Sequence, residues 1–553
     1  MKLLKLHINS NYGSIIKGFK FQFRAPYNER ASEIMDWVEF HPFCFAGLNG
    51  SGKSNVLEAI ANIFYHIECC SNVNQPKNFQ EFFQPEICKP DAFELDYYIC
   101  KEEKYSIENL IKVSISKKEK NETEGEYGFP KMTYQPFPFK EEPIPVSVVA
   151  EKYAKSPAPA KRYLPDLIIG YSSGENEILS IPFLKTRLLH FDEYRIALEE
   201  KAIYEEPESS LLYVDYEMSQ AVLLANFIFQ EEKVLKPLHV ELGIADIVRF
   251  RMNINLHKYE DKLIIEQYRN VIDAFKRCAT TAYEEKNERL VLDFWINSAS
   301  RDAFKKNFPK GIFQLFQAFQ ILYTLNYHGI EEEIKSEVYQ SKGYYTDGKI
   351  PKPKPAETVF HFLDYYIKKS FPDSNKEVYL LMKNLSDGEQ QFLHTMGICL
   401  MLENKSALLL LDEPETHFNP DWRSKFISTL KESLDQSQSN NLMHDILITS
   451  HSPFIISDCY PDKVVVFENG KSPINAKELD IPTFGTSVNI LTNKIFGSKK
   501  TISGFSYEKL NDYRKRFEEG ESYEKIQIEI NEKFGDSIEK LLLLKELSDK
   551  SKK

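Results

Sequence analysis

A glycine-rich stretch near the N-terminus constrains the fold of this chain more than any other feature. Residues 43–55 read FCFAGLNGSGKSN and contain the spacing G-x-x-x-x-G-K-S. The apolar run Phe43–Ala46 leads into the glycines, and apolar residues at helical spacing follow them: Val56, Leu57, Ile60, Ile63 and Phe64. A strand, a tight turn and a helix in this order direct several backbone N–H groups at one anion. The pattern predicts a phosphate-binding loop, because a chance glycine-rich turn would lack these flanking elements.

The residues of this loop differ in the chemistry that each can supply. The ammonium group of Lys53 can reach the β- and γ-phosphates of a nucleotide as a point charge. The hydroxyl oxygen of Ser54 is a ligand for Mg²⁺. We therefore expect ATP and Mg²⁺ to be the cofactors. The expected nucleotide contacts in this loop are Gly47, Asn49, Gly50, Ser51, Gly52, Lys53, Ser54 and Asn55.

A second apolar strand, far along the chain, ends in two acidic residues. Residues 406–420 read SALLLLDEPETHFNP, and the unbroken run Leu408–Leu411 is typical of a parallel strand buried on both faces. Asp412 follows at the carboxyl end of the strand, where α/β sheets place ligands, and is expected to hold Mg²⁺. Glu413 is the expected general base that orients the attacking water. A purely structural acidic pair is disfavoured, because buried carboxylates are costly without a metal or hydrogen bonds.

A third apolar segment, Asp445–His451, reads DILITSH. We expect it to form a strand beside the acidic one, so that His451 faces the γ-phosphate. Taken alone, this histidine fits a capping role equally well. The other motifs favour the functional interpretation.

The segment Leu385–Gln390, LSDGEQ, resembles the signature motif of ABC-type ATPases. In that family the motif binds the γ-phosphate of ATP held by a second protomer. The resemblance therefore implies a homodimer or higher oligomer in which ATP is sandwiched between two heads. Physically, a serine, a glycine and a helix N-terminus make an anion site of the required kind. The implied contacts are Ser386, Gly388 and Gln390.

Three stretches together, GLNGSGKSN, LLLLDEPETHFNP and ITSHSPFIIS, are similar to the SMC/RecF/OLD-like branch of these ATPases. Within that branch the chain resembles ATPase subunits of prokaryotic anti-phage defence and restriction-associated systems. The heptad coiled coil of SMC proteins is absent from the sequence. The stretch after Phe505 is too short for the Toprim nuclease of OLD-type enzymes. The resemblance therefore implies a separate effector subunit, with a nuclease as the first candidate.

The positions of the motifs predict an α/β fold with an ABC-type P-loop ATPase head, formed by the N- and C-terminal parts around a largely helical insertion. The expected N-terminal lobe covers residues 1–115 and carries the phosphate loop. Proline and charge dominate after Lys117, and helical periodicity follows, so 116–375 is expected to be linker and mainly helical insertion. The C-terminal lobe is expected over 376–506, and a helical tail over 507–553.

The composition of the chain argues against several other classes of protein. Hydrophobic residues make up 42% of the chain, which indicates a globular protein. The net charge of -12 argues against a protein covered by nucleic acid, although a local basic groove remains compatible with it. No apolar run reaches the roughly 18 residues of a membrane span. The eight cysteines show no metal-ligand spacing, so we expect a cytoplasmic protein with reduced thiols and no membrane contact.

Several weaker patterns stay open. Residues 169–178 read IGYSSGENEI and mimic a signature at four positions: Ser172, Ser173, Gly174 and Glu175. The stretch Leu211–Glu217, LLYVDYE, mimics a second acidic strand. No second G-K-S loop exists, so a serine-capped helix followed by a buried strand is the favoured interpretation, although Ser173–Glu175 could still contact nucleotide or a partner. A glutamine loop has three candidates: Gln75, Gln80 and Gln84.

The leading functional hypothesis is an ATPase whose ATP-driven head closure gates an effector in anti-phage defence. The first alternative is a RecF-like repair or recombination ATPase that acts directly on DNA. The second is a slow-turnover platform that uses ATP for assembly. DNA stays open as a partner, because the basic clusters of the chain fit ordinary solvated surface at least as well. These clusters are Lys352–Lys354, Lys499–Lys500 and Arg514–Arg516.

Overall fold

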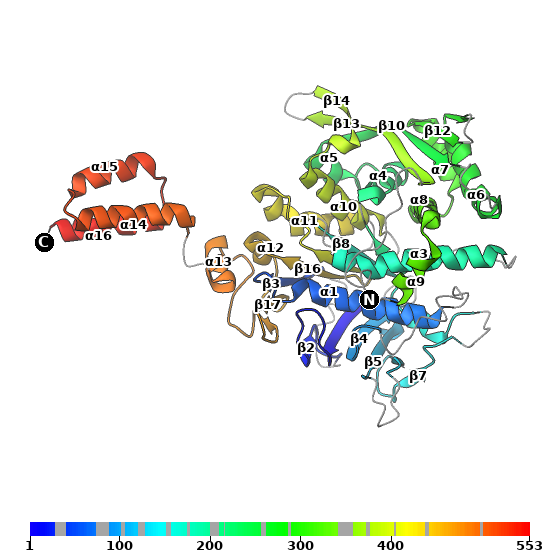
Figure 1. The fold of residues 1–553 in the computed structure, drawn as a ribbon, viewed down its shortest axis with the longest axis horizontal. Helices are drawn as coiled ribbons and strands as arrows, with labels where there is room; N and C mark the ends of the chain where they lie inside the picture. The colour runs from blue at the N-terminus through cyan, green and yellow to red at the C-terminus, as the bar shows by residue number, and fades with distance from the viewer. Residues whose placement is uncertain are drawn as a thin grey trace.

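The computed structural model describes most of the chain. The described residues are 1–27, 40–72, 88–100, 106–119, 128–150, 156–173, 177–199, 210–214, 216–255, 262–285, 289–340, 358–371, 376–402, 405–436, 442–497 and 501–552. Within them the chain is a mixed α/β protein with three β-sheets, as the fold prediction expected in its general class (Figure 1).

A seven-stranded sheet runs through the middle of the molecule. Its strand order is β18-β17-β3-β16-β15-β8-β9, and each adjacent pair is parallel except β17 with β18. In chain order the strands are β3 (Phe43–Gly47), β8 (Leu167–Ser172), β9 (Leu211–Tyr213), β15 (Ala407–Asp412), β16 (Asp445–Ser450), β17 (Val464–Phe467) and β18 (Ile474–Asn475). Parallel strands share one carboxyl edge, so the loops that follow β3, β15 and β16 meet there.

The side chains of this sheet divide between two hydrophobic cores. Leu409 and Leu411 belong to the core that also contains residues of α4 (Tyr216–Phe229), α10 (Asp387–Met401) and α11 (Pro420–Gln436). Leu408 and Leu410 belong to the core that contains residues of α1 (Lys53–Ser71) and α3 (Glu177–Glu199). Burial on both faces explains why the β15 sequence is apolar at every position before Asp412.

A six-stranded antiparallel sheet, in the order β2-β1-β4-β5-β6-β7, shares the core of α1. Its strands are β1 (Lys2–Ile8), β2 (Phe19–Gln22), β4 (Phe93–Cys100), β5 (Leu110–Lys117), β6 (Lys131–Pro136) and β7 (Ile144–Val146). Arg24 forms a buried ion pair with Asp445 on β16, at 2.7 and 2.8 Å to the two carboxylate oxygens. Loss of either partner would leave a buried charge, so the pair favours one arrangement of the two sheets.

The middle of the chain carries a five-stranded antiparallel sheet, in the order β11-β12-β10-β13-β14. The strands are β10 (Ile244–Asn255), β11 (Thr281–Glu284), β12 (Arg289–Trp295), β13 (Phe360–Phe371) and β14 (Lys376–Leu381). The helices of this region are α5 (Lys236–Leu242), α6 (Lys262–Cys278), α7 (Ser298–Asn307), α8 (Ile312–Thr324) and α9 (Glu332–Gln340).

This region differs from the largely helical insertion that the sequence indicated. Besides the antiparallel sheet, it supplies β8 and β9 to the central sheet and β6 and β7 to the N-terminal one. The reason is that sheet partners lie far apart in sequence. Ile254 of β10, for example, pairs with Phe360 of β13. Local periodicity does not record such pairings.

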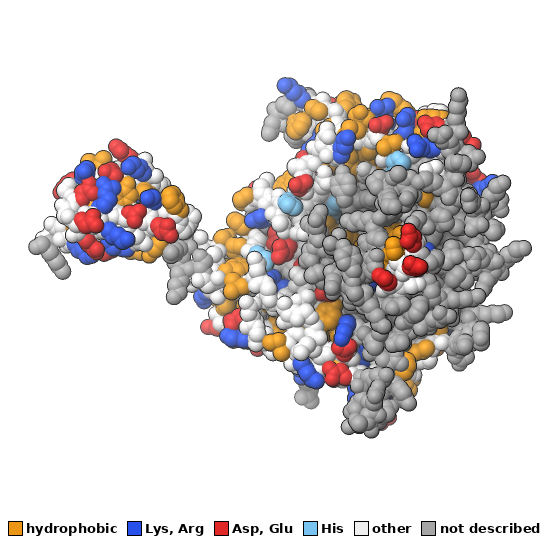
Figure 2. Space-filling model, in the orientation of Figure 1, with side chains coloured by type: hydrophobic (Ala, Val, Ile, Leu, Met, Phe, Trp, Pro, Cys, Tyr) orange, Lys and Arg blue, Asp and Glu red, His pale blue; other side chains and the backbone are white. Residues whose placement is uncertain are grey.

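The C-terminal part continues with α12 (Pro453–Ser457) and α13 (Val488–Phe496), and it ends in α14 (Gly504–Glu518), α15 (Tyr523–Lys533) and α16 (Ile538–Ser551). The last three helices have a small core of their own and project from the body of the molecule (Figure 1). Lys, Arg, Asp and Glu side chains are interspersed on their surface (Figure 2). Arg514 and Arg516 form ion pairs with Glu546, Glu521 and Glu529. The other two basic clusters, Lys352–Lys354 and Lys499–Lys500, lie outside the described residues.

Across the described ranges, no helix combines the length and the apolar character that a bilayer crossing requires.

Candidate functional site

Three glycines with positive φ stand at the end of β3 and in the loop that leads to α1. Gly47 has φ +148°, and a Cβ atom at this position would lie 2.3 Å from the carbonyl oxygen of Phe467. Gly50 and Gly52 have φ values of +75° and +95°, which favour glycine. α1 begins directly afterwards at Lys53, so its unpaired N–H groups and positive end adjoin the loop. The strand, turn and helix therefore follow one another as an anion site requires.

Lys53 lies against this loop. Its side chain is buried, and its Nζ donates hydrogen bonds to the carbonyl oxygens of Gly47 at 3.2 Å and Leu48 at 2.9 Å. Burial lowers the pKa of Lys53, and the nearby carboxylates of Glu413 and Asp412 oppose that shift. The ammonium group thus sits between the glycine turn and the acidic end of β15.

Asp412 receives hydrogen bonds from hydroxyl groups on three other segments. Ser54 Oγ donates to its Oδ1 at 2.7 Å, and Thr449 Oγ1 donates to the same oxygen at 2.6 Å. Ser172 Oγ, at the end of β8, donates to Oδ2 at 3.4 Å. The carboxylate is buried but well satisfied, so its charge is compatible with its position.

The oxygens of Ser54 and Asp412 fit a hard divalent cation such as Mg²⁺. This ion binds oxygen ligands and is usually held by one or two protein groups together with substrate phosphates. In the part of the chain that the structure describes, no cluster of three or more His, Cys, Asp or Glu side chains forms an all-protein metal site. Ser54 and Asp412, which lie 2.7 Å apart, correspond in number and ligand type to the protein groups that usually hold Mg²⁺ beside substrate phosphates.

Glu413 follows on a strained piece of backbone. Its φ of +48° is unusual for a residue with a side chain, and its N–H donates to Thr449 Oγ1 at 3.0 Å. Its Oε1 lies 3.1 Å from His451 Nε2. The hydrogen bond with His451 holds the pKa of Glu413 below its usual range. The carboxylate is thus kept in its ionised form, in which it is able to accept a proton.

The signature-like segment caps α10. Ser386 and Glu389 form a capping box, in which Glu389 Oε2 accepts from Ser386 N at 2.7 Å, and Lys369 pairs with Glu389. Gln390 Nε2 donates to Leu385 O at 2.9 Å. An open pocket adjoins this helix end, and its lining residues are Ser386, Asp387, Gly388, Glu389, His417, Asn419 and Trp422.

Gln391 connects this helix to the acidic strand. Its Oε1 accepts from His417 N at 2.9 Å, and its Nε2 donates to Glu413 O at 3.4 Å. Gly388 lies so close to the same loop that a Cβ there would be 2.8 Å from His417 O. The start of α10 is therefore joined to the 413–417 loop by two hydrogen bonds and one close backbone approach.

The remaining residues predicted to contact nucleotide in the glycine loop are exposed or bond residues other than Asp412 and Glu413. Asn49 and Gly50 are exposed, and Ser51 Oγ donates to Leu48 O at 2.8 Å. Asn55 faces another segment, because its Oδ1 accepts from Ser14 N at 3.0 Å and its Nδ2 donates to Glu58 at 3.1 Å.

Sequence reasoning missed several contacts of this site. Thr449 and Gln391 were not singled out, although both bond the acidic loop. Ser172 and Ser173 were noted only as a weak signature, yet Ser172 bonds Asp412 and Ser173 Oγ lies 2.8 Å from Thr416 Oγ1. The signal in the sequence that could have indicated these contacts is the pair of serines that follows the apolar residues of β8. The remaining members of that pattern, Gly174 and Glu175, and the glutamine candidates Gln75, Gln80 and Gln84 lie outside the described residues.

The chain is similar to a known protein family and to parts of two individual proteins. A family profile described as "AAA ATPase domain" matches residues 1–456. A stretch of 133 residues is 29% identical to protein ea59 of Escherichia phage lambda, and it covers 24% of each chain. Another of 153 residues is 23% identical to the Septu protein PtuA of Bacillus thuringiensis, and it covers 27% of this chain and 36% of that protein.

The alignments thus span about a quarter of ea59 and about a third of PtuA. The ATPase resemblance that the motifs indicated is confirmed by the profile match.

Proposed function

Because this chain belongs to the AAA ATPase domain family, we propose that it hydrolyses ATP with Mg²⁺ where β3, β15 and β16 end, and that ATP joins two copies to gate an effector. One observation carries the chemical part of this proposal. The side chains of Ser54, Asp412, Glu413 and His451 come together in two directly bonded pairs beside a glycine turn.

Each of these groups has a role that follows from its position. The glycine turn, the start of α1 and Lys53 bind the phosphates. Ser54 and Asp412 would hold Mg²⁺, which supplies positive charge against the phosphate oxygens. Glu413 orients the attacking water and accepts its proton, and His451 holds the Glu413 carboxylate in its ionised form.

The second copy is proposed from the signature segment. Ser386 and Gly388 stand at the N-terminus of a 15-residue helix and border an open pocket, which suits an anion brought by another molecule. The Gln391 contacts to His417 and Glu413 then connect occupancy of this pocket to the general base. The gated effector, a nuclease in anti-phage defence, is proposed from the motif resemblance.

The decisive experiment compares the full-length protein with its Glu413→Gln variant. We expect the variant to bind ATP, to lose nearly all turnover, and to shift to twice the mass in light scattering when ATP and Mg²⁺ are present. The exposed Glu478→Gln is the matched control and should behave as wild type. Unchanged turnover in Glu413→Gln would refute the assignment of the site. Turnover loss without a mass change would refute the dimer.

The same assay separates the alternatives. Strong stimulation of turnover by double-stranded DNA that fades as salt rises would favour the RecF-like function. Tight ATP binding with negligible turnover in the wild type would favour the assembly platform.

A further inference from the structure

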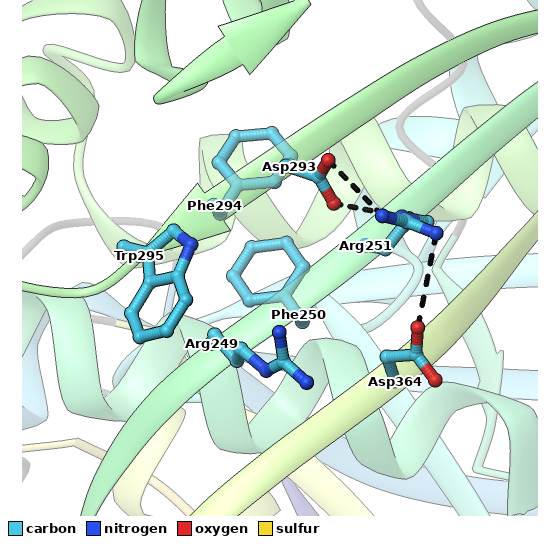
Figure 3. A pocket seen from close by; sticks show the side chains of 7 residues that line it. All are labelled: Arg249, Phe250, Arg251, Asp293, Phe294, Trp295 and Asp364. Carbon is cyan, nitrogen blue, oxygen red and sulfur yellow. Dashed lines mark hydrogen bonds and ion pairs between the residues drawn. The ribbon is translucent and has the colours of Figure 1, made fainter.

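The antiparallel sheet of the middle region presents an arginine between two aromatic rings. The guanidinium carbon of Arg249, on β10, lies 5.3 Å from the ring centroid of Trp295 and 4.7 Å from that of Tyr366. Arg249 and Trp295 are direct cross-strand neighbours, and Figure 3 shows them side by side in a surface pocket. Stacking between rings fixes the plane of the guanidinium and leaves its N–H edge available.

The other cations of this face already have carboxylate partners. Arg251 bonds Asp293 at 2.7 and 3.2 Å and lies 3.9 Å from Asp364 (Figure 3). Lys368 pairs with Glu377 at 3.0 Å. Among the described residues, Arg249 contacts the two rings and forms no ion pair or hydrogen bond, and the two carboxylates of the same pocket, Asp293 and Asp364, are turned to Arg251.

We propose that the Arg249 pocket binds the carboxylate of an Asp or Glu side chain on an acidic segment of a partner protein. A planar guanidinium held by aromatic rings matches a carboxylate through two parallel N–H···O bonds. The cavity measures about 70 Å³, which suits a group of a few heavy atoms rather than a nucleobase.

The composition of the surrounding surface favours a protein over a nucleic acid. Trp295 is 50% exposed, and Tyr283 and Tyr379 on the neighbouring strands are 40% and 59% exposed. Exposed Trp and Tyr around an Arg are typical of the residues that dominate protein interfaces. A nucleic acid backbone needs several unpaired cations in a row, whereas the paired carboxylates here leave Arg249 as the free cation of the described pocket.

This inference does not rest on the proposed function, because its residues lie on β10, β12 and β13 and none belongs to the candidate ATP site. A variant of the pocket should therefore keep wild-type ATP turnover. That readout also shows that the variant is folded.

The test measures fluorescence anisotropy of a labelled hexaglutamate peptide titrated with the full-length protein at low salt. We expect wild-type protein to bind this peptide and not a hexaglutamine peptide. Arg249→Gln should weaken hexaglutamate binding at least about tenfold, as loss of a central interface arginine does. Arg277→Gln, an exposed arginine of the same region, is the control and should leave binding unchanged.

Two further probes sharpen the result. Arg249→Lys keeps the charge but loses the planar pair of N–H donors and the stacking on the rings, so it should also weaken hexaglutamate binding. Wild-type binding by this variant would overturn the proposal. Single-stranded oligothymidine that binds more tightly than hexaglutamate, in an Arg249-dependent way, would overturn it in favour of a nucleic-acid surface. Equal hexaglutamate binding by wild type and Arg249→Gln, or no binding to either, would overturn it as well.

Discussion

Ser54 Oγ donates a 2.7 Å hydrogen bond to Oδ1 of Asp412 across 358 residues of sequence. The bond joins the first turn of α1 to the end of β15. These elements meet because β16 lies between β3 and β15 in parallel register. Thr449 of β16 donates to the same carboxylate oxygen. The candidate site therefore exists only when distant parts of the chain share one sheet.

Asp412→Asn should abolish the Mg²⁺ dependence of catalysis. The amide keeps the size of the side chain but removes the charge that would hold the cation. We expect turnover to fall at least about 100-fold, the scale of losing one key electrostatic group. Phosphate release measured across a Mg²⁺ titration checks this, with Asp512→Asn on α14 as control. A variant with the wild-type Mg²⁺ response would show that Asp412 is not a metal ligand.

His451→Ala, which leaves no donor beside Glu413, should move the acidic limb of the pH–rate profile upward. The hydrogen bond with His451 lowers the pKa of Glu413, so its loss raises that pKa and the base becomes protonated at a higher pH. Turnover at fixed acidic pH should therefore drop more than turnover at pH 8. The measurement is the ATPase rate from about pH 4 to pH 8, because the wild-type limb lies below the usual pKa of a glutamate. An equal loss of turnover at every pH, with the acidic limb at its wild-type position, would contradict an effect of His451 on the pKa of Glu413.

Gly47→Ala should destabilise the protein far more than Gly50→Ala. Both positions have positive φ, but the new Cβ at Gly47 meets the Phe467 carbonyl oxygen at 2.3 Å, whereas nothing lies within 4 Å at Gly50. We expect the free energy of unfolding to fall by at least about 3 kcal/mol for Gly47→Ala and by about 1 kcal/mol for Gly50→Ala. Apparent melting temperatures of the two variants provide the comparison. Equal shifts would mean that the loop adjusts freely.

Glu415→Gln should change how stability depends on pH. Burial raises the pKa of Glu415 from 4.5 to about 7, and its Oε1 accepts a hydrogen bond from Ser450. The folded state therefore binds this proton more tightly than the unfolded state. Wild-type stability, relative to the glutamine variant, is then lost as pH rises from about 4.5 to about 7 and stays low above that.

The size of this effect follows from the shift of the pKa. A shift from 4.5 to about 7 lowers the free energy of unfolding by about 3 kcal/mol, and this loss is complete by pH 8. Denaturant midpoints of both proteins at pH 5 and pH 8 measure it. The midpoint of Glu415→Gln, relative to that of the wild type, should be higher at pH 8 than at pH 5. A difference that does not change with pH would show that Glu415 ionises normally.

Local patterns predicted the parts of the site that depend on neighbouring residues. The turn at Gly47–Gly52 needs φ values that glycine adopts, and the spacing of apolar residues after Ser54 indicates a helix. The unbroken run before Asp412 indicates a strand buried on both faces, as the two cores show. These features are visible in sequence because each is encoded within about one turn or one strand.

Only the tertiary structure decided which of these elements meet. The bonds of Asp412 with Thr449 and Ser172, and those of Gln391 with the 413–417 loop, depend on strand order and register. The pocket of Arg249 depends on the pairing of β10 with β12 and β13, so a middle region that seemed largely helical carries an exposed sheet. Such contacts join residues tens to hundreds of positions apart. Their energies come from packing and pairing across the fold, which no local sequence window contains.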